Sequence, residues 1–273
     1  MSKNTVNILF VGDIVGEPGL SLLETILPSL IKKHDADFVI ANGENSHKGK
    51  GINRSIIQRL YALGVHVITG GNHSFAKWKV FDYMKEDSHI LRPMNYPTGN
   101  PGYGFGIYDI PDFNQKIGVL NLQGRTFMNP IDDPFATADW VIDRMKKETN
   151  LIFIDFHAEA TAEKLALAWH LDGDVSLFAG THTHIPTNDA RLFPGGTGYI
   201  SDVGMTGSFD SVLGMDKDTS MKRFKLGTPH RYKLASGNNH LCAVAAAINV
   251  DTGHCHQIEP IIYPSFQSGK AEK

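Results

Sequence analysis

Residue types that bind metal ions recur through this sequence, each group directly after a short apolar run that has the length of a β-strand. The groups contain carboxylates, carboxamides and imidazoles, and no cysteine. Oxygen and nitrogen ligands favour iron, manganese, zinc or cobalt over calcium and over metals that prefer thiolates. The five groups are Gly12-Asp13, Asn42-Gly43-Glu44-Asn45, Gly70-Gly71-Asn72-His73, His157 and Gly180-Thr181-His182-Thr183-His184.

Each group alone has an ordinary structural explanation. Asp13 could be a turn or helix-cap residue, Asn45 or Asn72 a turn residue, and His157 a hydrogen-bonded buried histidine. The His-x-His pair is a stronger signal, because in a loop it can offer two imidazoles to neighbouring ions. Coincidence of all five groups at the ends of apolar runs favours one binuclear site. Two ions about 3.5–4 Å apart need a bridging carboxylate and further ligands each, which seven candidates can supply.

Apolar runs that alternate with helix-like periodicity predict the elements that position these groups. In parallel βαβ units the loops that follow the strands lie at one edge of the sheet, where the candidate ligands would converge. After residue 195 the helical periodicity fades, and we expect antiparallel strands at 231–235, 240–250 and 255–262. A long surface loop is expected at 92–106. The earlier strands are predicted at 8–11, 38–41, 65–69, 116–122, 151–156 and 175–179, and the helices at 18–33, 53–63, 136–147 and 163–170.

Length and composition indicate a globular protein. Of 273 residues, 41% are hydrophobic and 20% charged, which is enough to bury a large core. A net charge of −3 gives no broad basic field, so we expect no extended nucleic-acid surface. The longest apolar stretch, 241–248, is shorter than the ~20 residues that span a bilayer. We therefore predict a cytoplasmic protein that does not enter membranes, with a single domain at 1–266 and a frayed tail at 267–273.

The order of these motifs resembles that of the calcineurin-like metallophosphoesterases. It is more similar to their bacterial YmdB-type subgroup, which has Asn-Gly-Glu-Asn where most relatives have Gly-Asp. The likeness extends to 121–127, 132–135, 154–161 and 202–207, and covers the chain to about residue 262. It implies an α/β fold, the calcineurin-like four-layer α/β/β/α sandwich with mixed sheets, and it is compatible with a homo-oligomer.

The same resemblance implies hydrolysis of phosphodiesters, with 2′,3′-cyclic nucleotides such as 2′,3′-cAMP as the small substrate. It implies two metal ions per chain, iron (Fe2+/Fe3+) with Mn2+ as a substitute, and attack by a hydroxide that bridges them. Glu44 would bridge the ions, and His73 would be the general acid that protonates the leaving ribose oxygen. Asp13, Asn45 and His184 would complete one ion site, and Asn72, His157 and His182 the other.

Two positions depart from the pattern of the relatives. Ser74-Phe75-Ala76 stands where close relatives have Thr-Trp-Asp, so a carboxylate that could orient His73 is missing at Ala76. Val15 stands where many calcineurin-like enzymes have a histidine. The first departure leaves open an alternative, a regulatory protein that binds metal and nucleotide with weak or no turnover. A TIM-barrel metallohydrolase is disfavoured, because it would carry its His-x-His pair after the first strand.

Basic residues outside these groups could contact a substrate phosphate. Lys48-Gly49-Lys50 and the basic residues of 222–233 are candidates, but exposed charge runs are usually solvated or lie in oligomer contacts, which is the interpretation we favour. Arg125 is a better candidate, because it lies in a shared motif after a predicted strand.

Overall fold

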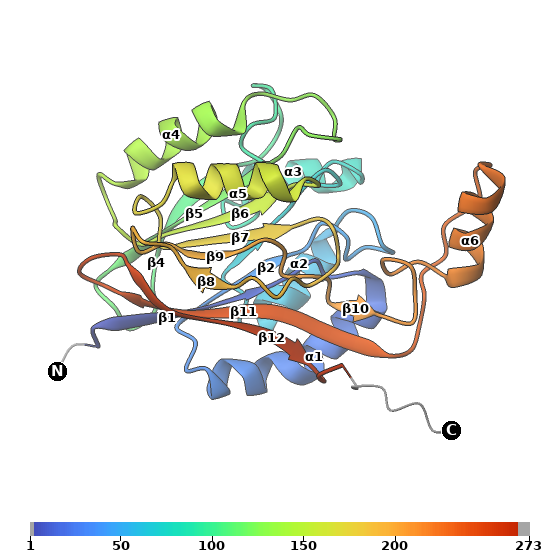
Figure 1. Ribbon diagram of the computed structural model, residues 1–273, viewed down its shortest axis with the longest axis horizontal. Helices are drawn as coiled ribbons and strands as arrows, with labels where there is room; N and C mark the ends of the chain where they lie inside the picture. The colour runs from blue at the N-terminus through green and yellow to red at the C-terminus, as the bar shows by residue number, and fades with distance from the viewer. Residues whose placement is uncertain (1–2, 267–273) are drawn as a thin grey trace.

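The computed structural model describes residues 3–266, and the tail predicted at 267–273 lies outside these residues. Two mixed sheets lie face to face between two layers of helices (Figure 1). The four-layer α/β/β/α sandwich predicted from the sequence is confirmed. That the described residues form one domain stays a prediction.

The first sheet has the strand order β10-β11-β1-β2-β3, with β12 paired to β11. Its first three strands in the chain run parallel, while β11 pairs antiparallel with β1, β10 and β12. Helical crossovers connect the parallel strands, so their carboxyl ends lie at one edge. The strands are β1 Thr5–Val11, β2 Phe38–Asn42, β3 Val67–Thr69, β10 Gly207–Ser208, β11 Asn239–Asn249 and β12 Cys255–Tyr263.

The second sheet has the strand order β4-β5-β6-β7-β9-β8. Its four central strands are parallel, and the edge strands β4 and β8 pair antiparallel with their neighbours. This sheet therefore also has an edge to which several parallel strands bring their carboxyl ends. The strands are β4 Phe105–Asp109, β5 Lys116–Gln123, β6 Ile152–His157, β7 Leu177–Thr181, β8 Arg191–Leu192 and β9 Gly198–Ile200.

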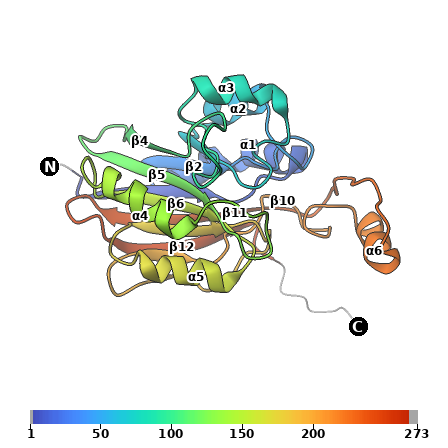
Figure 2. The same cartoon turned by 90° about the horizontal axis from the view of Figure 1, so that it is seen from above.

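Helices cover the outer face of each sheet. Seen from above, α1, α2 and α3 lie on one side of the sandwich and α4 and α5 on the other (Figure 2). Asn53 caps α2 by accepting from the Ile56 amide at 2.9 Å, and Asp133 caps α4 by accepting from the Phe135 amide at 2.8 Å. The helices are α1 Gly16–Lys33, α2 Arg54–Ala62, α3 Phe81–Glu86, α4 Pro134–Met145 and α5 Thr161–His170.

The alternation of side chains along the strands builds three apolar layers. Ile8 and Phe10 of β1 face the second sheet, and the ring of Phe10 lies 4.8 Å from that of Phe153 of β6. Leu9 and Val11 point the other way and pack under α1. Because successive strand residues face opposite sides, continuous apolar runs mark strands that are buried on both faces.

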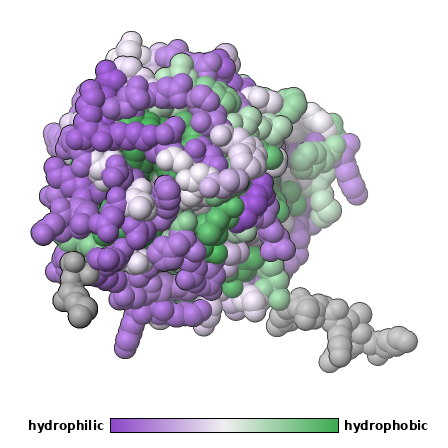
Figure 3. All heavy atoms as spheres, turned by 60° about the vertical axis from the view of Figure 1, so that its left-hand side comes forward, coloured by the Kyte–Doolittle hydropathy of each residue, from purple (hydrophilic) through white to green (hydrophobic). Residues whose placement is uncertain are grey.

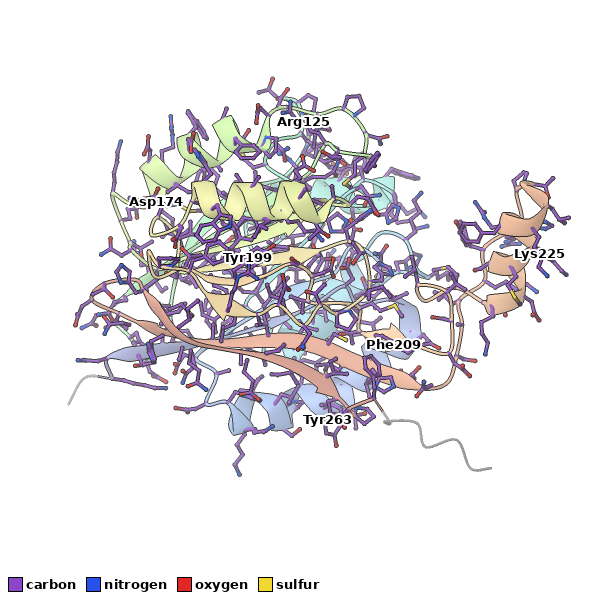
Figure 4. All side chains as sticks on the ribbon, in the orientation of Figure 1. Arg125, Asp174, Tyr199, Phe209, Lys225 and Tyr263 are labelled. Atoms are coloured by element: carbon purple, nitrogen blue, oxygen red, sulfur yellow. The ribbon has the colours of Figure 1, made fainter. Side chains whose placement is uncertain are left out.

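Residues 209–235, which we call the arm, leave the sandwich and carry α6 (Lys217–Leu226) away from it (Figure 1). Figure 4 labels Phe209 at the base of the arm and Lys225 on its helix. The strand predicted at 231–235 is wrong, since this part of the arm has only an isolated bridge between Met215 and Leu234. The loop predicted at 92–106 is wrong in part, because Arg92 is buried and β4 begins at Phe105.

The face brought forward in Figure 3 is mainly hydrophilic, with hydrophobic residues in separate patches. Among residues 3–266, no helix combines the length and the apolar character needed to cross a bilayer.

Candidate metal centre

The candidate ligands come from both sheets and meet where the carboxyl ends of their parallel strands lie together. Asp13 follows β1, Glu44 and Asn45 follow β2, and Asn72 follows β3; from the second sheet His157 ends β6, and His182 and His184 follow β7. The sequence predicted that these residues converge past the strand ends, and the structure brings them together from the edges of two sheets. Ligand atoms of Glu44, His157 and His182 all lie within 4.8 Å of one another.

His157 is fully buried, and its hydrogen bonds assign its tautomer. The Thr181 hydroxyl donates to Asp155 Oδ1 at 2.6 Å, so its oxygen accepts from His157 Nδ1 at 2.9 Å. The His157 proton is therefore on Nδ1, and Nε2 carries a lone pair. That lone pair lies 3.0 Å from Glu44 Oε1 and 2.9 Å from Asn72 Oδ1.

A cation placed among His157 Nε2, Glu44 Oε1 and Asn72 Oδ1 would be held by lone pairs of all three atoms. Ligands at about 2.1 Å from an ion and at right angles to each other are roughly 3 Å apart, which matches the spacing of this group. The residues therefore fit a metal ion. Figure 1 shows the loops after β2 and β7 at the same end of the sandwich.

The other candidate ligands surround Asp13 and Asn45. The Asn45 amide nitrogen lies 3.4 Å from Asp13 Oδ1 and 3.1 Å from His184 Nε2, and His184 Nε2 lies 3.9 Å from Asp13 Oδ1. Asn45 Oδ1 instead accepts from His73 Nδ1 at 2.8 Å. Holding an ion through this amide oxygen requires the amide group to turn over, which exchanges its oxygen and nitrogen.

His73 lies beside the cluster. Its backbone N–H donates to Glu44 Oε2 at 2.8 Å, which leaves Oε1 as the Glu44 atom that faces both His157 and Asn45. Among the described residues, His73 Nε2 has no hydrogen-bond partner, and the side chain is 28% exposed. His73 Nδ1 lies 3.5 Å from Glu44 Oε1, so the ring is adjacent to the group formed by Glu44, His157 and His182, and its place outside the coordination stays a prediction.

The loop with the two histidines has an unusual backbone. His182 has φ 100° and His184 has φ 67°, backbone conformations that residues other than glycine rarely adopt. Hydrogen bonds on each side hold it: the His182 amide donates to Asp13 Oδ2 at 3.1 Å and the Thr183 amide to Asp202 Oδ2 at 3.0 Å. The same Asp202 oxygen forms a buried ion pair with Lys164 at 2.7 Å.

Several contacts around the ligands were not predicted from the sequence. His184 Nδ1 donates to the carbonyl of Leu213 in the arm at 3.1 Å, which leaves Nε2 as the lone-pair nitrogen. His182 Nε2 lies 3.0 Å from Glu159, and this carboxylate can hold His182 with its Nδ1 facing His157. The sequence could have indicated a role for Asp155, which accepts from the Thr181 hydroxyl, because it is a charged residue inside an otherwise apolar strand.

Burial sets the protonation of the cluster. Desolvation lowers the pKa of His157 to about 4 and that of His182 to about 3, so both are neutral near pH 7. Neutral imidazole is the form that binds metal. Burial raises the pKa of Asp13. Burial also raises the pKa of Asp155 to about 7, although hydrogen bonds from Thr181, Thr69 and Asn42 act to lower it.

Gly71 is the position where the backbone approaches the ligands most closely. A methyl group there would lie 2.3 Å from His157 Cδ2 and 2.4 Å from Glu44 Oε2. No larger residue fits without moving two candidate ligands, which is a physical reason for the glycine that precedes Asn72.

A cavity of about 600 Å³ opens over the cluster. The ligand candidates at its base are Glu44, Asn45, Asn72, His182 and His184, and His73 and Glu159 line it beside them. Arg125 does not line this cavity; it pairs with Asp133 at 3.1 Å, and no role in substrate contact follows.

The two-sheet sandwich with a metal-ligand cluster at its carboxyl edges defines the class of the metallophosphoesterases. Residues 9–261 match a family model described as YmdB-like protein. The chain is 46% identical to the 2′,3′-cyclic-nucleotide 2′-phosphodiesterase of Bacillus subtilis (strain 168), covering 94% of this chain and 97% of that protein. The chain belongs to the YmdB-like family.

Solved structures agree with this assignment. A hypothetical protein from Thermus thermophilus is similar with a TM-score of 0.88 and 37% identity, covering 94% of this chain and 99% of that one. A novel phosphatase from Mycoplasma pneumoniae is similar with a TM-score of 0.89 and 34% identity, covering 95% and 93%.

Proposed function

We propose that the protein is a metal-dependent phosphodiesterase that hydrolyses 2′,3′-cyclic nucleotides such as 2′,3′-cAMP, with His73 as the general acid. The observation that carries the proposal is the unprotonated Nε2 of His157, which lies within 3.0 Å of an oxygen of Glu44 and an oxygen of Asn72. Glu44 and Asn72 line the open cavity. The family supports it, since the Bacillus subtilis relative is named as a 2′,3′-cyclic-nucleotide 2′-phosphodiesterase.

The chain would hold two ions through seven residues. Glu44 would lie between them, with Asp13, Asn45 and His184 at one and Asn72, His157 and His182 at the other. The resemblance to the family implies iron, with Mn2+ as a substitute, and the mixture of oxygen and nitrogen donors without thiolate is compatible with both. Bound ions would supply an activated water at neutral pH and stabilise charge on the phosphoryl oxygens.

His73 is placed to move a proton. Its ring lines the cavity beside the candidate ligands, held at Nδ1 by Asn45 and at the backbone by Glu44. When the Asn45 amide turns over to hold an ion, its nitrogen donates to Nδ1, so the proton of neutral His73 lies on Nε2 and can pass to a leaving ribose oxygen, which departs poorly unless it is protonated. Asn45 and Glu44 also supply the orientation that the missing carboxylate at Ala76 would give, which favours an enzyme over a regulatory protein without turnover.

Steady-state turnover of 2′,3′-cAMP by protein loaded anaerobically with Fe2+ or Mn2+ tests the proposal. His73→Ala should retain its metal and lose ~10²–10⁴-fold in kcat, the contribution of general acid catalysis. His170→Ala is the matched control, because His170 is an exposed histidine that pairs with Asp139 on the outer helices. Full activity of His73→Ala would remove its proposed role.

Metal analysis tests the ligands separately. Asp13→Ala and Glu44→Ala should contain less metal than the unaltered protein, measured by elemental analysis after desalting. Unchanged stoichiometry in both variants would overturn the ligand assignment. A cytoplasmic location and a homo-oligomer belong to the same proposal, and size-exclusion chromatography with light scattering tests the second.

A further inference from the structure

The cavity over the cluster has two unlike walls. Its volume of about 600 Å³ is in the range of small-molecule sites, about 300–1,000 Å³. Large hydrophobic side chains line it at Leu213, Met215 and Tyr232, and all three belong to the arm. Lys48 and Lys50, which follow the turn that carries Glu44 and Asn45, also line the cavity and form its charged wall.

The hydrophobic wall is held in place by contacts within the arm. The Arg223 guanidinium of α6 lies 4.1 Å from the centre of the Tyr232 ring and donates to the His230 carbonyl at 3.0 Å. Met215 forms backbone bridges with Val212 and with Leu234. Tyr232 is nevertheless 57% exposed, so its ring is fixed but open to a ligand.

Contacts with Gly49 and with His184 also fix the position of the arm relative to Lys48 and Lys50 and relative to the candidate ligands. A methyl group on Gly49 would lie 3.0 Å from Met215 Cε and 2.8 Å from Leu234 Cδ2, so the two walls touch at this glycine. The Leu213 carbonyl accepts from His184 Nδ1 at 3.1 Å. The hydrophobic wall therefore has a defined position relative to the candidate ligands.

A ligand complementary to this cavity has an anionic group over the cluster and the lysines, and a flat apolar ring against the arm. A nucleoside phosphate has this shape and charge. Bases stack on aromatic side chains irrespective of sequence, and methionine sulfur makes favourable contacts with rings. We propose that the arm forms the nucleobase subsite, with Tyr232 as the stacking residue, an inference that rests on the proposed phosphodiesterase function.

Two substrates that differ only in the base test this subsite. One is 2′,3′-cAMP, and the other is methyl β-D-riboside 2′,3′-cyclic phosphate, which has the same phosphodiester without a base. Tyr232→Ala should raise KM for 2′,3′-cAMP by ~10–100-fold, the effect of losing one base–aromatic stack. The preference for 2′,3′-cAMP over the baseless substrate, measured as a ratio of kcat/KM values, should fall toward one. Tyr232→Trp should keep it.

Phe224→Ala is the matched control, because Phe224 is an aromatic residue of the same arm, 85% exposed, that does not line this cavity. It should keep the preference. A Tyr232→Ala variant with the wild-type ratio would overturn the subsite. So would a Phe224→Ala variant that loses the preference equally, since the loss would then reflect the arm as a whole.

Calorimetry separates this inference from the function on which it rests. Metal-loaded wild-type protein should bind adenosine 3′-monophosphate more tightly than inorganic phosphate, and Tyr232→Ala should lose that difference. If the loaded wild-type protein hydrolyses neither cyclic phosphate, the phosphodiesterase proposal fails, while the calorimetric difference still decides the subsite. Equal affinities of wild type and Tyr232→Ala for the adenosine phosphate would refute it.

Discussion

The buried ion pair between Lys164 and Asp202 should carry a large part of the stability of the loop that holds His182 and His184. At the Nζ–Oδ2 distance of 2.7 Å, Coulomb attraction at an effective dielectric constant of about 20 is about 6 kcal/mol. Desolvation offsets part of this, because the two side chains are only 1% and 2% exposed. Lys164→Met leaves Asp202 buried without its cation, and we expect a loss of about 3–5 kcal/mol of unfolding free energy.

Urea unfolding of the metal-free protein, followed by circular dichroism, measures this loss by linear extrapolation. Lys116→Met is the control, since Lys116 pairs with Glu148 at 3.3 Å with both side chains about half exposed. That variant should lose less than about 1 kcal/mol. Lys164→Met should also bind less metal, because Asp202 holds the Thr183 amide between the two histidines.

Two results would refute this reasoning. The first is a Lys164→Met protein whose unfolding free energy equals that of the wild type or of the Lys116→Met control. The second is a destabilised Lys164→Met protein that binds metal with wild-type stoichiometry and affinity, since Asp202 would then not position the histidine loop.

Two further predictions concern single positions. Gly71→Ala places a methyl group within 2.4 Å of both His157 and Glu44, so metal content should fall and stability should drop by about 1–3 kcal/mol from overpacking; wild-type metal content would contradict this. Burial lowers the pKa of His66, whose Nδ1 accepts from the Val39 amide at 3.0 Å only when unprotonated. Its contribution to stability is therefore present above its unfolded pKa of about 6.5 and is lost as the pH falls below it. His66→Asn keeps an acceptor that does not titrate, so the fall in unfolding free energy between pH 7 and pH 5 should be smaller than in wild type, and equal falls would contradict the assignment.

The central strands of the sandwich could be predicted from the sequence, because strands that are buried on both faces require apolar side chains. The runs at 8–11, 38–41 and 151–156 are apolar on both faces because helices cover one side and the other sheet covers the opposite side. The arm could not be predicted in this way. Helix α6 buries little beyond Ser220, so it has no apolar stripe, and its basic residues were interpreted as part of an exposed charge run.

The ligand types could be predicted because they follow strand ends, and parallel strands bring their ends together. The contacts that orient the ligands depend on tertiary placement instead. Leu213 acts through a backbone carbonyl, which every residue has, and no side-chain pattern can mark it. Lys164 lies in α5, which was predicted as a helix, but no sequence pattern indicated that the structure would bury it against Asp202 from a loop 38 residues away.

The position of the cluster between two sheets couples metal binding to the assembly of the sandwich. Of the candidate cluster, Glu44 comes from the first sheet and His157 and His182 from the second, so an ion held by all three would join the two sheets. His157 Nε2 of the second sheet lies 3.0 Å from Glu44 Oε1 and 2.9 Å from Asn72 Oδ1 of the first sheet. A ligand that binds only the folded state adds its binding free energy to stability. Binding of an ion by these side chains would therefore also stabilise the contact between the sheets.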